Sequence, residues 1–395
     1  MIDEHFSSWP SFSDEEAQAV YDVLLSNKVN YWTGNEGRMF EKEFAEFAGC
    51  DHAVALANGT VALDLAFKAI GLGKGDEVVV TSRTFLASVS SIINSGATPI
   101  FADVDFASQN VTVDTISEVI TNRTKAIVCV HLAGWPCDMD PIMELARAHN
   151  YYVIEDCAQA HGAQYKGRSV GSIGHVGCWS FCQDKIMTTG GEGGMVTTND
   201  KMLWSKMWSF KDHGKSWDAV YNRKHPSGFR WLHESFGTNA RITEMQAKIG
   251  RIQLTKLEHW NKLRRLNSQR ILRTAMECES LIVPNLSCTN CEGGLLNCAS
   301  GCRHAAYKCY VYVDGDRALR DGYLDEINKC GVPCFSGSCS EVYLEKAFDN
   351  LLDKPSSSLP NAKMLGDTSL MFLCHPTLTE AEINLTCETI IQVCK

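Results

Sequence analysis

A single lysine stands where an apolar run gives way to a glycine-rich turn. Lys185 lies between Cys178-Trp-Ser-Phe181 and Gly190-Gly-Glu-Gly-Gly194. Glycine has no side chain to clash, so such a turn lets the backbone pass close to a bound ligand. A loop lysine is ordinarily a solvated surface residue. Lys185 therefore acquires a chemical meaning only if residues of complementary chemistry lie near it.

Apolar segments from His52 onward indicate the fold that would bring such residues together. They are short and alternate with amphipathic helical patterns. Strands that are apolar throughout and separated by helices are typical of a mostly parallel sheet covered on both faces, which predicts an α/β fold. The segments span residues 53–57, 78–80, 99–102, 126–130, 151–154 and 195–198.

Polar and glycine-containing segments follow several of these apolar runs. In open α/β sheets, ligands bind beyond the carboxyl ends of the strands, so we expect these segments to meet at one edge. The segments are Asn58-Gly-Thr60, Thr81 to Phe85, His131, Asp156 to Gln159, and Ser180 to Lys185.

One lysine, an upstream acid, a hydroxyl group and a glycine-opened helix together fit pyridoxal phosphate. The amine of Lys185 would bind the cofactor aldehyde covalently and then act as a general base. Asp156 would keep the pyridine nitrogen protonated. The cofactor phosphate would bind the N–H groups of Gly59 and Thr60 at a helix start, and the hydroxyl of Ser180.

The composition limits the function classes. The chain has 395 residues, 45% hydrophobic content and a formal charge of −10. The negative charge argues against nucleic acid as the main partner. We predict neither a membrane span nor a signal peptide, because no stretch of about 18 apolar residues occurs and the N-terminus is acidic. We therefore expect a cytoplasmic protein.

The 18 cysteines predict reduced core residues rather than a disulfide framework. Cys288, Cys291, Cys298 and Cys302 begin like a zinc knuckle, but the second pair is more widely spaced and the loop between the pairs is short. We expect no metal, and a zinc site remains the alternative for this cluster.

The chain is expected to form two domains. Residues 1–250 would be a large domain that includes an N-terminal segment of about 50 residues. Residues 251–395 would contain a long bridging helix and a small α+β domain. Residues 211–236 are basic and aromatic without periodicity, which is typical of a functional flap.

The ordered set of motifs closely resembles the DegT-type nucleotide-sugar aminotransferases, which are fold type I pyridoxal phosphate enzymes. The resemblance runs from about Trp9 to the C-terminus and is densest from Ala53 to Gln246. The motifs are Asn58-Gly-Thr60, Gly75-Asp-Glu-Val-Val79, Thr84-Phe85, Gly96-Ala-Thr-Pro99, Asp103-Val-Asp105, His131-Leu-Ala-Gly134, Glu155-Asp-Cys-Ala-Gln159, Gly167, Ser180-Phe181, Lys185, Gly191-Glu-Gly-Gly194 and Gly237-Thr-Asn-Ala-Arg241.

The resemblance implies a role for each matching residue. Lys185 matches the lysine that binds the cofactor, and Asp156 matches the partner of the pyridine nitrogen. Gln159 matches the residue beside the ring hydroxyl, whereas Gly59, Thr60 and Ser180 fall on phosphate-binding positions. Phe85, which on composition alone is more readily a core residue, falls on the ring-stacking position. Asn239 matches an asparagine that reaches the cofactor phosphate of the neighbouring subunit, which implies a homodimer with active sites at its interface.

The resemblance also implies the reaction. A related branch of sugar 3-dehydratases has histidine in place of the lysine, so the retained Lys185 favours transamination. We expect glutamate to donate its amino group, through the pyridoxamine form of the cofactor, to a nucleotide-linked keto sugar such as a 4-keto-6-deoxyhexose for amino-sugar or polysaccharide biosynthesis. Sugar dehydration or epimerisation, and a non-catalytic regulatory protein that binds the cofactor, are the alternatives.

Substrate contacts are expected from Trp32, His213, Arg223 and Arg230. The last three lie in the flap of residues 211–236. The basic residues of this flap could bind a nucleotide diphosphate, or the flap could seal the dimer. Both interpretations remain open.

Overall fold

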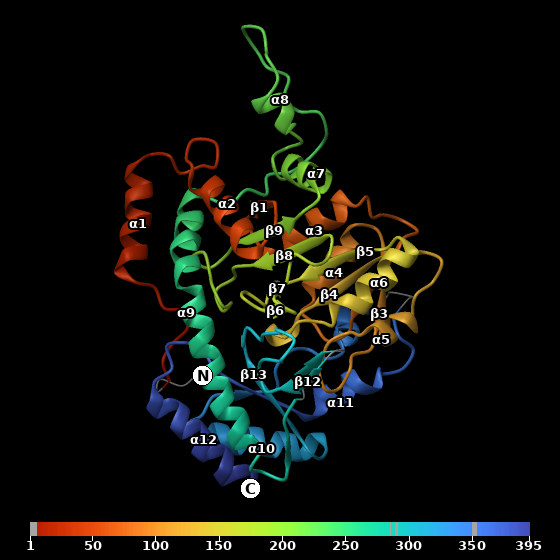
Figure 1. Cartoon of the computed structure of the whole chain (residues 1–395), viewed down its shortest axis with the longest axis vertical. Coiled ribbons are helices and arrows are strands. Elements are labelled where there is room, and N and C mark those ends of the chain that lie inside the picture. Colours follow the sequence, from red (N-terminus) through yellow and green to blue (C-terminus); the bar gives the residue numbers. More distant parts are fainter. Residues whose placement is uncertain (1–5, 285, 289–290, 350–353) are drawn as a thin grey trace.

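A seven-stranded sheet forms the centre of the larger part of the molecule (Figure 1). The computed structural model describes residues 6–284, 286–288, 291–349 and 354–395, with the backbone alone for 286–288 and 291–293. The strand order is β1-β9-β8-β5-β4-β2-β3. β9 is antiparallel to both neighbours and the other four pairs are parallel. The strands are β1 (His52–Leu56), β2 (Glu77–Thr81), β3 (Thr98–Ala102), β4 (Thr124–Val130), β5 (Tyr152–Asp156), β8 (Val176–Ser180) and β9 (Gly194–Thr198).

Both faces of this sheet are buried. Neighbouring residues of β2 point to opposite faces and pack into two different cores. Val78 and Val80 pack into a core formed with α3, α4 and α7, whereas Val79 packs into a second core that includes α6 and α9. The predicted α/β fold with a mostly parallel sheet is thus confirmed. The helices of this part are α1 (Asp14–Leu25), α2 (Glu36–Ala48), α3 (Gly59–Ala69), α4 (Ala87–Asn94), α5 (Val113–Ser117), α6 (Met139–His149), α7 (Lys201–Lys211) and α8 (Trp217–Tyr221).

A long helix connects the large sheet to a smaller one. The helix α9 (Glu244–Ala275) contacts α1 and α2 near its start, and it also packs on α12 and β13. The smaller sheet is antiparallel, with the order β10-β13-β15-β14. The domain boundary at residue 250 stays a prediction. The elements of the smaller part are β10 (Leu281–Ile282), β13 (Cys309–Val313), α10 (Arg317–Lys329), β14 (Cys334–Phe335), α11 (Pro360–Thr368), β15 (Ser369–Phe372) and α12 (Glu380–Cys394).

Two short hairpins complete the strands. The first pairs β6 (Gln164–Tyr165) with β7 (Arg168–Ser169), and the second pairs β11 (Leu286–Cys288) with β12 (Cys291–Gly294). The side chains of Cys288 and Cys291 lie outside the described residues, so the alternative of a four-cysteine metal site stays a prediction. None of the described helices is long and apolar enough to cross a membrane.

The segment of residues 211–236, which we call the arm, projects from the body of the molecule. Figure 1 shows α8 and the loop that follows it extending beyond α7. Three aromatic residues of the arm are largely exposed: Phe229 by 76%, Trp231 by 82% and Phe236 by 99%. The prediction of a loop without continuous periodic structure is confirmed, apart from Lys211 at the end of α7 and the five residues of α8.

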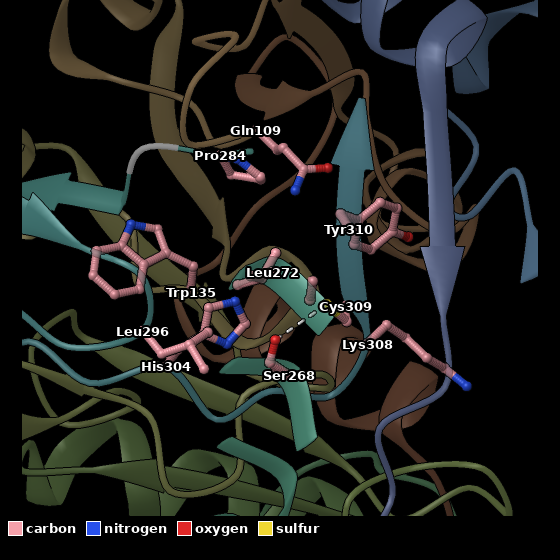
Figure 2. Close-up of a pocket in the computed structure, with 11 residues that line it drawn as sticks. Gln109, Trp135, Ser268, Leu272, Pro284, Leu296, His304, Lys308, Cys309 and Tyr310 are labelled. Carbon is pink, nitrogen blue, oxygen red and sulfur yellow. Dashed lines mark hydrogen bonds between the residues drawn. The ribbon is translucent and has the colours of Figure 1, made fainter. Parts of the chain in front are cut away.

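A small cavity lies where the two parts of the chain meet (Figure 2). Its volume of about 20 Å³ has room for one water molecule. Ala133 and Trp135 line it from the large part, Ser268 comes from α9, and His304 and Tyr310 come from the small part. Its size excludes a cofactor or a sugar, so the functional site lies elsewhere.

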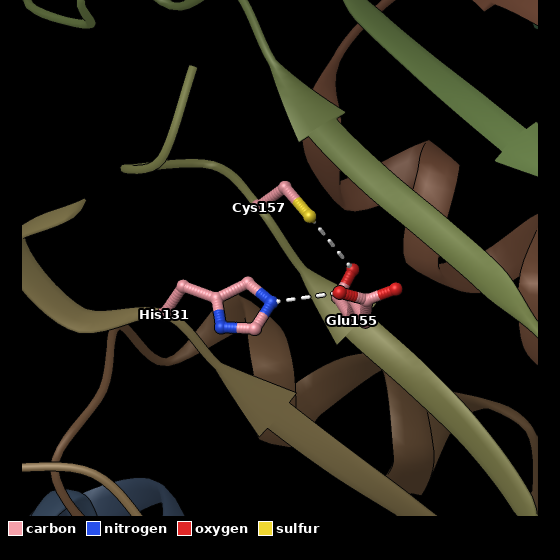
Figure 3. Close-up of side chains that lie close together, drawn as sticks. All are labelled: His131, Glu155 and Cys157. Atoms are coloured by element: carbon pink, nitrogen blue, oxygen red, sulfur yellow. Dashed lines mark hydrogen bonds and ion pairs between the residues drawn. The ribbon is translucent and has the colours of Figure 1, made fainter. Parts of the chain in front are cut away.

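A buried hydrogen-bond network fixes the end of β5 next to Asp156 (Figure 3). The carboxylate of Glu155 accepts hydrogen bonds from the backbone N–H groups of Gly171, Ile173 and Gly174 at 2.6 to 2.9 Å. Nε2 of His131 lies 3.0 Å from the same carboxylate. Burial alone would raise the pKa of Glu155, but the hydrogen bonds from His131 and the backbone outweigh it and hold the pKa below its ordinary value.

This network also accounts for a cluster of potential metal ligands. Ligand atoms of His131, Glu155 and Cys157 lie within 4.8 Å of one another. Nδ1 of His131 accepts the backbone N–H of Cys137 at 3.0 Å, so Nε2 carries the proton and donates to Glu155. Neither nitrogen then has a lone pair to offer a metal, and the cluster is explained as a structural network.

We expect Glu155→Gln to lower the free energy of unfolding by about 3 kcal/mol at neutral pH. The amide group of glutamine has only one oxygen, so its NH2 group would face backbone N–H donors that the carboxylate now accepts. The stabilisation of the fold by ionised Glu155 is fully present at pH values above the pKa that this residue has in the unfolded chain, near the ordinary value of 4.5. It is lost as the pH falls through the lower folded pKa. The difference from the wild type should therefore shrink in acid. Urea unfolding at pH 7 and at pH 4 measures this change, with the exposed Glu118→Gln as control.

Candidate active site

Strand pairing brings the predicted site residues to one edge of the large sheet. Gly194 at the start of β9 pairs with Leu56 at the end of β1, and with Ser180 at the end of β8. Asp156 at the end of β5 pairs with Cys178 on the neighbouring β8. The start of α3, Ser180 and Asp156 thus lie side by side, as the rule for strand ends predicts.

The beginning of α3 and Ser180 form a tight anion cradle. A side-chain carbon at Gly59 would lie 2.6 Å from Cβ of Ser180, which is far inside normal contact distance. Oδ1 of Asn58 accepts the N–H of Val61 at 2.9 Å. The N–H groups of Gly59 and Thr60 have no acceptor within the helix, because the first turn of a helix leaves its donors free. A phosphate would satisfy these donors and the positive end of α3.

Asp156 is a buried acid whose hydrogen bonds come from neutral groups. Its side chain is only 7% exposed. Oδ2 accepts the hydroxyl of Ser88 at 2.7 Å, and Oδ1 accepts the backbone N–H of Ala158 at 3.1 Å. No lysine, arginine or histidine among the described residues forms an ion pair with it. A buried carboxylate in this state favours a positively charged partner, which a protonated pyridine nitrogen would supply.

Lys185 lies in the turn after β8, next to a tyrosine from the small part of the chain. Its ammonium is 5.1 Å from the centre of the Tyr307 ring. The phenol of Tyr307 donates a hydrogen bond to Asp184. Burial alone would raise the pKa of Asp184, but the charge of Lys185 and this hydrogen bond keep the pKa below its ordinary value. Tyr307 therefore holds the loop that carries Lys185 against the small part.

Trp9 anchors the backbone of Lys185 from the other end of the sequence. Its indole N–H donates a hydrogen bond to the carbonyl of Lys185 at 2.8 Å. The ring packs edge-on against Trp260 and stacks on His375, with the guanidinium of Arg264 at 4.8 Å from its centre. The N-terminal segment, α9 and the small part thus meet at the lysine backbone.

Three further predicted cofactor residues lie in different surroundings. Oε1 of Gln159 accepts the backbone N–H of Ala133 at 2.7 Å. The side chain of Phe85 is 73% exposed, so its ring is available for stacking. Asn239 is exposed at the base of the arm, where its backbone pairs with Asp212. Their roles toward the cofactor stay predictions.

The four predicted substrate residues lie in different surroundings, and their roles toward a substrate stay predictions. Trp32 packs edge-on against Trp208, with their ring centres 6.1 Å apart. Arg223, on the arm, forms ion pairs with Asp218 at 3.0 Å and Glu234 at 2.6 Å. His213 and Arg230 are exposed at the base and on the outer part of the arm, respectively.

Four residues were missed in the sequence: Trp9, Ser88 and Tyr307, which contact Lys185 or Asp156, and Lys308, which lies 5.0 Å from the centre of the Tyr307 ring. None of them directly follows a strand, which was the signal used for the others. Trp9 is an isolated tryptophan in a polar N-terminal segment, and this pattern could have marked it as an anchor. The remaining three carry no signal in their neighbours along the sequence.

Comparison with known proteins identifies the family. The family model of the DegT/DnrJ/EryC1/StrS aminotransferases matches residues 10–391. The chain belongs to this family. It is an aminotransferase of fold type I, and its cofactor is pyridoxal phosphate.

Two relatives with known names are similar in sequence to this chain over most of their length. GDP-perosamine synthase of Caulobacter vibrioides is 36% identical over 380 residues, which are 94% of each chain. For GDP-perosamine synthase of Escherichia coli O157:H7, the identity is 44% over 249 residues, which are 63% of this chain and 65% of that protein. A crystal structure of an aminotransferase from Psychrobacter cryohalolentis is 60% identical, covers 98% of both chains and has a TM-score of 0.94.

The residues described above fit pyridoxal phosphate. The cradle of Gly59, Thr60 and Ser180 would hold its phosphate, and the unpaired carboxylate of Asp156 would hold its pyridine nitrogen. Lys185 would reach its aldehyde. The donors at the helix start and the buried acid are polar groups that the described protein atoms leave partly unsatisfied, and the cofactor has the complementary charge at both places.

We expect Gly59→Ala to weaken the binding of pyridoxal phosphate by about tenfold or more, because the added methyl group pushes α3 away from Ser180. The matched control is Gly73→Ala, where an added carbon would meet no atom within 4 Å. Titration of cofactor into the apo protein gives the affinity, and thermal unfolding of the apo protein tests the fold. Unchanged affinity in Gly59→Ala would contradict the assignment of the cradle.

Proposed function

We propose that this protein transfers an amino group from glutamate to the keto group of a nucleotide-linked sugar, in the cytoplasm. The observation that carries the proposal is Lys185, which lies on the same sheet edge as the buried, unpaired Asp156 and the cradle at Gly59. The names of relatives support the substrate class: GDP-perosamine synthases, and the dTDP-3-amino-3,6-dideoxy-alpha-D-galactopyranose transaminase of Aneurinibacillus thermoaerophilus, 40% identical over 254 residues.

Each residue has a task in this reaction. The cofactor, when bound, serves as the electron sink for the carbon that gains or loses the amino group. Asp156 would hold the ring nitrogen in its protonated form, and the cradle at Gly59 and Ser180 would hold the phosphate. Lys185 moves the proton at the reacting carbon. Trp9 and Tyr307 orient the lysine loop, since one binds its backbone and the other binds its neighbour Asp184.

The cytoplasmic location is supported by the state of the buried cysteines. Cys129 and Cys137 are buried next to each other without a disulfide bond between them. Neighbouring thiols stay reduced in the cytosol. This observation fits an enzyme that works on soluble nucleotide sugars.

We expect Lys185→Ala to lose the visible absorbance band of the lysine-bound cofactor and to reduce amino transfer by at least about 100-fold, because the covalent anchor and the general base are both removed. The assay measures 2-oxoglutarate formed from glutamate when a set of nucleotide-linked 4-keto-6-deoxyhexoses is supplied. The exposed Lys201→Ala serves as control.

The same assay separates the alternatives. Consumption of the keto sugar without formation of 2-oxoglutarate would point to dehydration or epimerisation. A wild-type protein that shows the absorbance band but converts no member of the set would point to a regulatory protein. Full activity in Lys185→Ala would contradict the assigned role of the lysine.

The arm is proposed to seal a homodimer. Its aromatic side chains Phe229, Trp231 and Phe236 face solvent in the single chain, and exposed apolar patches of this kind mark interaction surfaces. Arg223 is already neutralised by Asp218 and Glu234, which makes it a poor ligand for a nucleotide diphosphate. Of the two interpretations of this segment, these contacts favour the dimer. Asn239 at the base of the arm would then reach the cofactor of the partner.

We expect the double variant Trp231→Ser and Phe236→Ser to sediment as a monomer under conditions where the wild type is a dimer. Because both side chains are exposed, the fold of the single chain should stay intact, as circular dichroism would show. Met276→Ser, at a 63% exposed position after α9, is the control. A double variant that remains dimeric would exclude the arm as the main contact.

A further inference from the structure

Lys308 lies near Lys185, and both lysines contact the ring of Tyr307. Its ammonium is 5.0 Å from the centre of the Tyr307 ring, and that of Lys185 is 5.1 Å from the same centre. The two ammonium groups are therefore separated by at most the sum of these distances, about 10 Å. Figure 2 shows the side chain of Lys308 directed away from the small cavity lined by Ser268 and His304. Among the described residues, its ammonium forms no ion pair.

The surroundings of Tyr307 carry an excess of positive charge. Besides the two lysines, the buried guanidinium of Arg264 donates to the Tyr307 carbonyl at 3.3 Å, and its Nε and Nη2 have no partner among the described residues. The described carboxylate nearby is that of Asp184, which the phenol of Tyr307 already binds. Burial lowers the pKa of Lys308, the negative charge of Asp184 opposes this effect, and the charges of Arg264 and Lys185 lower the pKa further. A bound anion would relieve this repulsion.

We propose that Lys308 binds a carboxylate of the amino-acid donor. The inference rests on the proposed function, in which an amino acid delivers its amine to the cofactor bound at Lys185. The carbon that bears this amine also bears a carboxylate, and in glutamate a second carboxylate follows about 5 Å away. Adding the length of a salt bridge, about 3 Å, gives a reach of about 8 Å, which lies within the upper limit of about 10 Å on the spacing of the two lysines.

The keto sugar differs from the amino acid next to its reacting carbon, because it carries no carboxylate on that carbon. Next to its reacting carbon it presents hydroxyl groups, and its phosphates lie beyond the sugar ring. An unpaired, half-buried cation gains more from a carboxylate than from a neutral hydroxyl group. Lys308 would thus contribute to the half-reaction of the amino acid and have little effect on the half-reaction of the sugar. This selectivity is the property to test.

The first experiment measures binding without turnover. Glutarate, a dicarboxylate that has no amine, is titrated calorimetrically into the cofactor-loaded wild type, Lys308→Met and Lys308→Arg. We expect the dissociation constant to rise at least about tenfold in Lys308→Met and to return close to the wild-type value in Lys308→Arg. Lys329→Met, at an exposed lysine paired with Glu326, is the control. Equal constants in the wild type and Lys308→Met, or no glutarate binding by the wild type, would overturn the proposal.

The second experiment separates the two half-reactions. Bleaching of the visible band by glutamate reports the first one, and its return on adding the keto sugar reports the second. We expect Lys308→Met to raise the KM for glutamate about tenfold with little change in the limiting rate, and to leave the sugar half-reaction unchanged. An equal effect on both half-reactions, or an effect on that of the sugar alone, would contradict the inference.

These readouts keep the two proposals apart. If the wild type binds glutarate through Lys308 but glutamate does not bleach the band, the proposed amino donor is wrong and the carboxylate site stands. If glutamate bleaches the band equally well in Lys308→Met, the carboxylate site is wrong and the proposed function stands. An unchanged visible band and melting temperature in Lys308→Met would show that the variant is folded.

Discussion

Two adjacent buried acids at the end of β5 are the constraint on which the site depends. Glu155 satisfies its charge within the protein, since three backbone N–H groups and His131 surround it. Within the described part of the chain, Asp156 receives hydrogen bonds from one hydroxyl group and one backbone N–H group. The first acid fixes the strand end and the loop of residues 171–174, and the second is left to a positively charged ligand. Because the side chains of a strand alternate, a single strand end supplies both a rigid support and a reactive position.

The other parts of the site follow from this strand end. β8 pairs with β5 and leads to Lys185, whereas β9 returns beside β8 and brings Gly194 against Asn58. The start of α3 can lie close to Ser180 because Gly59 has no side chain between them. The site therefore needs little specialised architecture beyond the sheet itself, which agrees with the general position of ligands in open α/β folds.

How far the sequence predicted the structure depends on whether a contact is local. The strands, the long helix and the positions of Asp156, Ser180 and Lys185 could be predicted, because apolar runs and the residues after them are visible in a local pattern. Trp9, Tyr307 and Lys308 could not, because they reach the lysine loop from distant parts of the chain. Trp32 packs against Trp208, and its predicted contact with the substrate stays a prediction. The sequence of the arm shows that it lacks periodicity. It contains no local signal for the direction in which the arm projects.

The anchor of Lys185 by Trp9 has a consequence for the synthesis of the protein. Trp9 emerges from the ribosome early, yet its ring is packed by Trp260 and His375, which emerge late. The lysine loop can therefore reach its final position only after nearly the whole chain has been made. A prematurely terminated chain would contain the reactive lysine without its support. The packing around the lysine backbone thus joins segments that are made at opposite ends of synthesis.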